Sequence, residues 1–157
     1  MSKYDWLLFF HVTGAFLLIG GTVMGGAFSF AMVRRDVPSE ILLLHGLTRV
    51  AVAAISAGVL LTIVFGLWLV DVRGYGYGEF WVVASLVLWV YANAAGGVGG
   101  RREKRTRELA ERLVAEGDFP SAELRARVRD PVSLALSYSS GVAILLILVL
   151  MIWKPGA

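Results

Sequence analysis

Between Trp6 and Val33 the chain reads WLLFFHVTGAFLLIGGTVMGGAFSFAMV, and His11 is the only ionisable side chain in that run. A helix needs about 20 consecutive apolar residues to cross the hydrocarbon of a bilayer. Because lipid offers the backbone no hydrogen-bonding partner, the run should be helical. The apolar part of a cleaved signal peptide is shorter, about 7–15 residues. The run therefore predicts a retained membrane span at residues 6–33.

Three further apolar runs have the length of a membrane span. They cover residues 41–70, 80–100 and 132–153. Hydrophobic residues make up 57% of the 157-residue chain and charged residues 17%, more apolar surface than a soluble domain of this size can bury. The sequence predicts one all-α domain over residues 1–157, a transmembrane four-helix bundle.

The distribution of basic residues predicts the orientation of these spans. Of the 15 Lys and Arg residues, 12 fall on one side of the predicted membrane, most of them in the loop 101–130. The other side carries Lys3, Arg73 and Lys154. Because positive charge stays in the cytoplasm, we expect both termini outside and a basic, partly helical loop inside. This loop should attract anionic lipids rather than nucleic acid.

The sequence contains no recognisable catalytic or metal-binding motif. There are no cysteines, and no Asp or Glu lies within any of the four runs. Phosphate-binding loops, zinc-binding HExxH helices and serine nucleophile elbows are all missing. We therefore expect no metal site, and the sequence favours a non-enzymatic protein.

The two histidines are the candidate functional residues, since ionisable groups inside a membrane are costly. His11 lies two turns into the first span, and His45 lies near the opposite end of the second. Helix rise separates their depths by about 25 Å, so they cannot share one ligand. His11 could bind a haem or bond to a neighbouring helix, where a serine or tyrosine of the fourth span is the expected partner. His45 and Arg49, one turn apart, could contact a lipid headgroup.

Small residues recur along every span at a spacing that brings helix backbones together. The glycines that we expect at such contacts are Gly21, Gly25, Gly58, Gly66, Gly96 and Gly141. Most should pack within the bundle, and one stripe could face a second membrane protein or another copy of the chain.

Four stretches carry a resemblance to a known family: LLFFHVTGAFLLIGG at 7–21, GLWL at 66–69, WVVASLVL at 81–88 and WKPG at 153–156. They resemble a bacterial family of four-helix membrane proteins of unknown function, DUF2269. That resemblance implies a bacterial plasma membrane as the location. More distantly, a histidine early in the first span followed by paired glycines is similar to four-helix, haem-b-associated protoporphyrinogen oxidases and copper-resistance membrane domains. That second resemblance implies that His11 is a haem ligand.

Two functional interpretations follow. In the first, the chain is a non-enzymatic accessory or assembly subunit of a larger membrane complex and needs no cofactor. In the second, it binds haem b through His11 and serves a redox or porphyrin-handling role. An absorption spectrum of the purified protein separates them.

Overall fold

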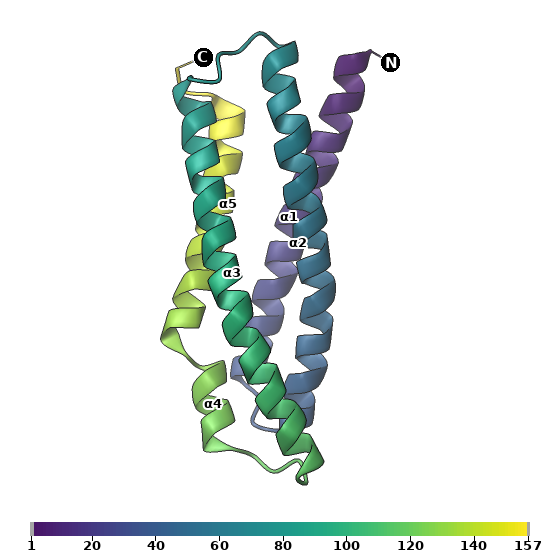
Figure 1. Ribbon diagram of the computed structural model, residues 1–157, viewed down its shortest axis with the longest axis vertical. Helices are drawn as coiled ribbons and strands as arrows, with labels where there is room; N and C mark the ends of the chain where they lie inside the picture. Colours follow the sequence, from purple (N-terminus) through teal and green to yellow (C-terminus); the bar gives the residue numbers. More distant parts are fainter. Residues whose placement is uncertain (1, 157) are drawn as a thin grey trace.

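The computed structural model describes residues 2–156 and contains five helices within them. Their bounds are Lys3–Val33 (α1), Pro38–Val72 (α2), Phe80–Ala115 (α3), Ala122–Val128 (α4) and Pro131–Trp153 (α5) (Figure 1). Met1 and Ala157, part of the predicted domain, lie outside the described residues. Helices α1, α2, α3 and the α4–α5 segment are long and apolar enough to cross a membrane. The predicted all-α bundle of four spans is confirmed.

Both termini lie at one end of the bundle, and α4 lies at the other (Figure 1). We call these the termini end and the α4 end. Helix α3 continues without interruption through the basic segment to Ala115, beyond the predicted end of its span at residue 100. Asp130 begins α5 by accepting hydrogen bonds from the backbone N–H groups of Val132 and Ser133, with Pro131 in the first turn.

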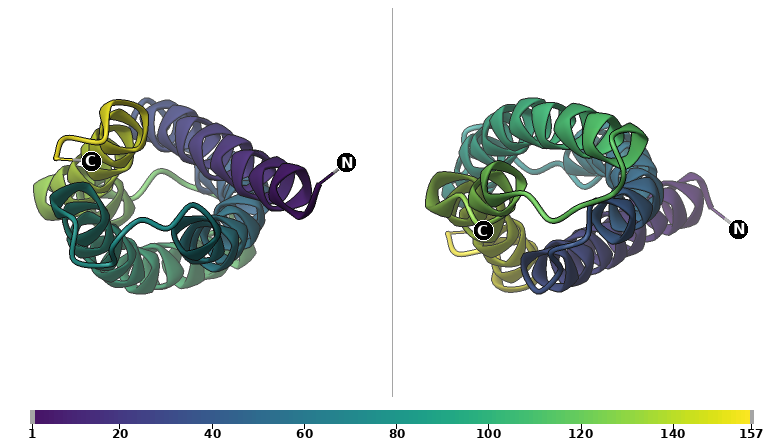
Figure 2. Two further views of the ribbon diagram at one scale, coloured as in Figure 1. Left: turned by 90° about the horizontal axis from the view of Figure 1, so that it is seen from above. Right: turned by 90° about the horizontal axis from the view of Figure 1, so that it is seen from below.

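The helices associate as two pairs, α1 with α2 and α3 with α5, and contacts between the pairs are sparser. Viewed along the bundle, the four long helices surround a common axis (Figure 2). Glycines allow the close approach of α1 to α2. A Cβ on Gly58 would lie 2.5 Å from the backbone N of Leu18 and 2.7 Å from the carbonyl oxygen of Gly14. Backbone contact of this kind is how helices associate in lipid.

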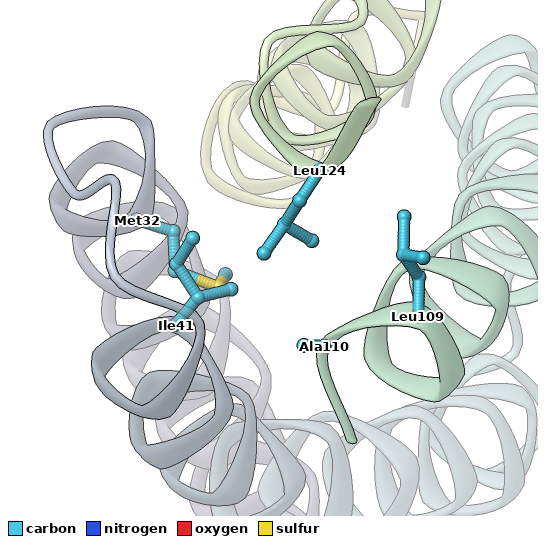
Figure 3. Packing of buried hydrophobic residues seen from close by; sticks show 5 residues of the cluster. All are labelled: Met32, Ile41, Leu109, Ala110 and Leu124. Carbon is cyan, nitrogen blue, oxygen red and sulfur yellow. The ribbon is translucent and has the colours of Figure 1, made fainter. Parts of the chain in front are cut away.

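At the α4 end, a compact apolar cluster joins both pairs (Figure 3). It consists of Met32, Ile41, Leu109, Ala110 and Leu124. Ile41 and Leu124 are fully buried. The cluster takes residues from α1, α2, α3 and α4, so it packs the two helix pairs against each other at this end. A smaller cluster of Val70, Trp81 and Val82 lies at the termini end.

Large apolar side chains are exposed along all four spans. Examples are Phe16 on α1, Leu60 on α2, Val87 on α3 and Ile152 on α5. Exposed apolar surface on this scale is not found on soluble monomers. It is the surface that a bilayer would solvate.

Candidate functional site

A cavity of about 550 Å³ opens between the two helix pairs in the half of the bundle nearest the termini. Its wall combines the first half of α1, the last part of α2, the first part of α3 and the end of α5. The wall is largely apolar and carries no Asp or Glu. Pockets that bind small organic ligands have volumes of about 300–1,000 Å³, so this cavity is large enough for a cofactor.

His11 lines this cavity and is the only histidine that does. Its Nδ1 lies 3.1 Å from the backbone carbonyl oxygen of Thr62 on α2. Because a carbonyl oxygen only accepts, Nδ1 carries the proton and donates it. The neutral imidazole then keeps the lone pair on Nε2, the arrangement found when a histidine binds a metal through Nε2.

Gly66 makes room for the His11 ring. A Cβ at Gly66 would lie 2.9 Å from His11 Cε1 and 3.0 Å from Nδ1. The Nδ1–Cε1 edge of the ring therefore rests on α2, and the Nε2 side faces away from Gly66. The fourth span does not supply the hydrogen-bonding partner expected for His11. Ser140 of α5 instead lies 3.3 Å from the carbonyl oxygen of Ala92, to which its hydroxyl donates.

Across the cavity, α3 presents two polar groups that sequence reasoning missed. Ser85 Oγ and Trp89 Nε1 are buried and have no hydrogen-bonding partner among the described residues. They lie one turn apart and both residues line the cavity. Buried polar atoms without partners are rare and costly, so these two groups stand out in an otherwise apolar wall.

The termini-end rim of the cavity carries two cations held by tyrosines. Arg73 Nη2 lies 3.1 Å from the hydroxyl of Tyr4, and Lys154 Nζ lies 3.4 Å from that of Tyr75. Each cation also lies over a tyrosine ring, at 4.5 Å for Arg73 and 4.9 Å for Lys154. The sequence analysis used both residues to predict topology, and Lys154 also as part of the WKPG stretch of the resemblance.

His45 does not line the cavity that contains His11 and lies at the α4 end instead. It is 6% exposed and lines a pocket of about 50 Å³ at the α4 end, together with Glu103 and Thr106. Its Nε2 has no partner among the described residues. Counting from Thr62 to His45 along α2 gives about 25 Å between the two sites. Arg49 is exposed, so the two residues proposed to share a headgroup have different surroundings; the headgroup role stays a prediction.

The six glycines expected at helix contacts have different surroundings. Cβ atoms at Gly21, Gly58 and Gly66 would collide with neighbours, whereas Gly25 and Gly141 have only ordinary contacts near 4 Å. A Cβ added at Gly96 would meet no neighbouring atom within 4 Å. A packing role for Gly96 therefore requires a partner outside this chain.

The described residues bring together no group of three or more His, Asp or Glu side chains suited to a metal ion. The cavity has one imidazole in a largely apolar wall, with two partnerless polar atoms buried behind it on α3. Such a wall suits a large flat or elongated apolar ligand, with His11 as its one strong donor atom.

The family model described as "Predicted integral membrane protein (DUF2269)" matches residues 5–155. No curated protein and no solved structure matches the chain. The match covers all four apolar helices, and we conclude that the chain belongs to the DUF2269 family of predicted integral membrane proteins.

Proposed function

We propose that this chain is a haem-b-binding membrane protein and that His11 is the axial ligand of the haem iron. The observation that carries the proposal is the hydrogen bond of His11 Nδ1 to the Thr62 carbonyl, at the wall of a 550 Å³ cavity. A histidine aimed through its second nitrogen in this way is the usual axial ligand of haem.

The rest of the wall suits a tetrapyrrole. The cavity is apolar, as the macrocycle is, and the absence of carboxylates from the lining leaves no buried negative charge to oppose the ligand. Residues of both helix pairs form the wall, so a bound macrocycle would join two pairs that otherwise touch sparsely. Haem would supply one-electron transfer, and the chain would position it and shield it from water.

Haemin titration of the detergent-purified protein tests the proposal. Wild-type protein should give a shifted Soret band that saturates at one haem per chain. His11→Ala should abolish the saturable band, while His45→Ala, whose site is about 25 Å away, should leave it intact. Loss with His45→Ala but not with His11→Ala would move the site to the α4 end and overturn the assignment.

A second candidate function is an accessory or assembly subunit of a larger membrane complex. The observation that favours it is a set of glycines that face no other helix of the chain. Cβ atoms at Gly20, Gly26, Gly96 and Gly100 would meet nothing within 4 Å. Small residues facing outward allow a second membrane helix to approach closely. Native gels of solubilised membranes test this, because a subunit would migrate with a larger complex and Gly96→Leu would release it.

The proposed setting is a bacterial plasma membrane with the α4 end in the cytoplasm. Arg102, Arg107 and Arg129 are among the basic residues at that end, where anionic lipid headgroups would meet them. The exposed Arg49 would contact the same headgroups. In this orientation the cavity and its rim lie in the half of the bilayer away from the cytoplasm.

A further inference from the structure

Arg73 and Lys154 carry positive charge at the termini end of the cavity, and neither forms an ion pair within 4 Å with a carboxylate of residues 2–156. Both residues line the cavity. All seven ion pairs of the described residues lie elsewhere, near the α4 end or within the basic part of α3. Arg73 contacts the hydroxyl and ring of Tyr4, and Lys154 contacts the hydroxyl and ring of Tyr75 and lies near the Trp81 ring. The Trp81 indole N–H donates to the Glu79 carboxylate, so an acidic group lies close to this contact.

The two cations come from different helix pairs. Arg73 is the cap residue directly after α2, and Lys154 is the cap residue directly after α5. Tyr4 of α1 contacts Arg73, and Tyr75, in the connection between α2 and α3, contacts Lys154. The cations therefore flank the cavity from opposite pairs, as two separate anionic groups on one ligand would require.

Their depth relative to His11 sets the size of the ligand. Gly66 contacts His11, and Arg73 follows Gly66 by seven residues of helix. At 1.5 Å per residue the rim lies about 10 Å from the level of His11. The wall between them is apolar, with Leu69 and Val70 on α2 and Met151 on α5. A suitable ligand therefore has an apolar body with its anionic groups at one edge.

We propose that Arg73 and Lys154 bind the two carboxylates of a tetrapyrrole and orient its carboxylate edge toward the termini end. This proposal rests on the proposed haem-binding function and specifies how the ligand is recognised. Cations paired with carboxylates form the stronger class of hydrogen bonds, and the fork of Arg73 can bind one carboxylate with two of them. The tyrosines hold the cations in place before the ligand enters.

Haemin and its dimethyl ester distinguish this proposal from simple apolar binding, because esterification removes both charges and keeps the macrocycle. Wild-type protein should bind haemin at least about tenfold more tightly than the ester, the loss expected for one charge-assisted hydrogen bond. Arg73→Gln and Lys154→Gln should each weaken haemin binding by about tenfold and leave ester binding unchanged.

Lys3→Gln is the matched control, because Lys3 lies at the same end over the Trp68 ring but does not line the cavity. It should bind both ligands as wild type does. Arg73→Lys, which keeps the charge, should retain most of the preference for haemin. Thermal unfolding of each variant before titration separates lost binding from lost folding.

The possible results distinguish carboxylate recognition by Arg73 and Lys154 from haem binding through His11. If haemin and the ester bind equally and both depend on His11, haem binding stands and the carboxylate recognition is wrong. Equal loss of both ligands in Arg73→Gln and Lys154→Gln contradicts it too, because those cations would then serve only the helix ends, where positive charge is favoured. If wild-type protein binds neither ligand, both proposals fail.

Discussion

The imidazole of His11 on α1 is aimed by the carbonyl oxygen of Thr62 on α2, across 3.1 Å. This link crosses between the two most tightly packed helices of the bundle. Since glycine contacts fix α1 against α2, the ring has a fixed support on one side and the cavity on the other. The functional proposals depend on this geometry.

Gly66→Ala should change the orientation of the His11 ring while leaving the imidazole side chain itself unchanged. The added methyl would lie 2.9 Å from His11 Cε1, so the ring must turn and lengthen its hydrogen bond to Thr62. Loss of an orienting hydrogen bond typically costs about 10–100-fold in metal affinity, and we expect that reduction in haemin affinity. Gly46→Ala on the same helix is the control, because nothing lies within 4 Å of that position. Equal haemin binding by both variants would show that the orientation of His11 does not matter.

Gly21 and Gly25, one turn apart on α1, should respond differently to alanine. A Cβ at Gly21 would lie 2.8 Å from the carbonyl oxygen of Ala51, whereas at Gly25 the nearest atom is 3.9 Å away. Overpacking of this kind costs about 1–3 kcal/mol, so Gly21→Ala should lower the midpoint of thermal unfolding in detergent. Gly25→Ala should leave the midpoint unchanged or raise it slightly, because alanine favours helix. Equal midpoints for the two variants would contradict the close α1–α2 contact at Gly21.

The orientation in the membrane can be tested directly because the chain has no cysteine. Gly76→Cys lies in the connection between α2 and α3, and Glu116→Cys lies just after α3. An impermeant thiol reagent added to intact cells should label the first and spare the second until the membrane is opened, as the positive-inside rule predicts. The reverse pattern would invert the topology and place the cavity in the cytoplasmic half.

The four spans could be predicted because each is a property of a continuous segment. Apolar length alone defined them. The start of α5 also has a local signal, since Asp130 caps the helix and Pro131 occupies its first turn. The uninterrupted α3 was also foreseeable from the helix-forming basic segment that follows residue 100. These features depend on neighbours along the chain.

The site could be predicted only in part, because it depends on how the two helix pairs are placed. His11 was identifiable as an ionisable group in lipid, but its partner is a backbone carbonyl, which every residue possesses. Ser85 and Trp89 carried no signal until α3 was seen to face the cavity. Arg73 and Lys154 are far apart in sequence, and only the fold brings both to one rim. His45 and Arg49 share a helical spacing, yet burial separates them.

Chemical rescue of the histidine tests the central claim most directly. His11→Gly removes the side chain and leaves room beside the cavity for free imidazole. The account predicts that haemin added to this variant gives no saturable Soret band, and that millimolar imidazole restores a band like that of the wild type. His45→Gly should need no imidazole. A His11→Gly protein that binds haemin with the wild-type spectrum in the absence of imidazole would contradict the assignment of His11 as the axial ligand.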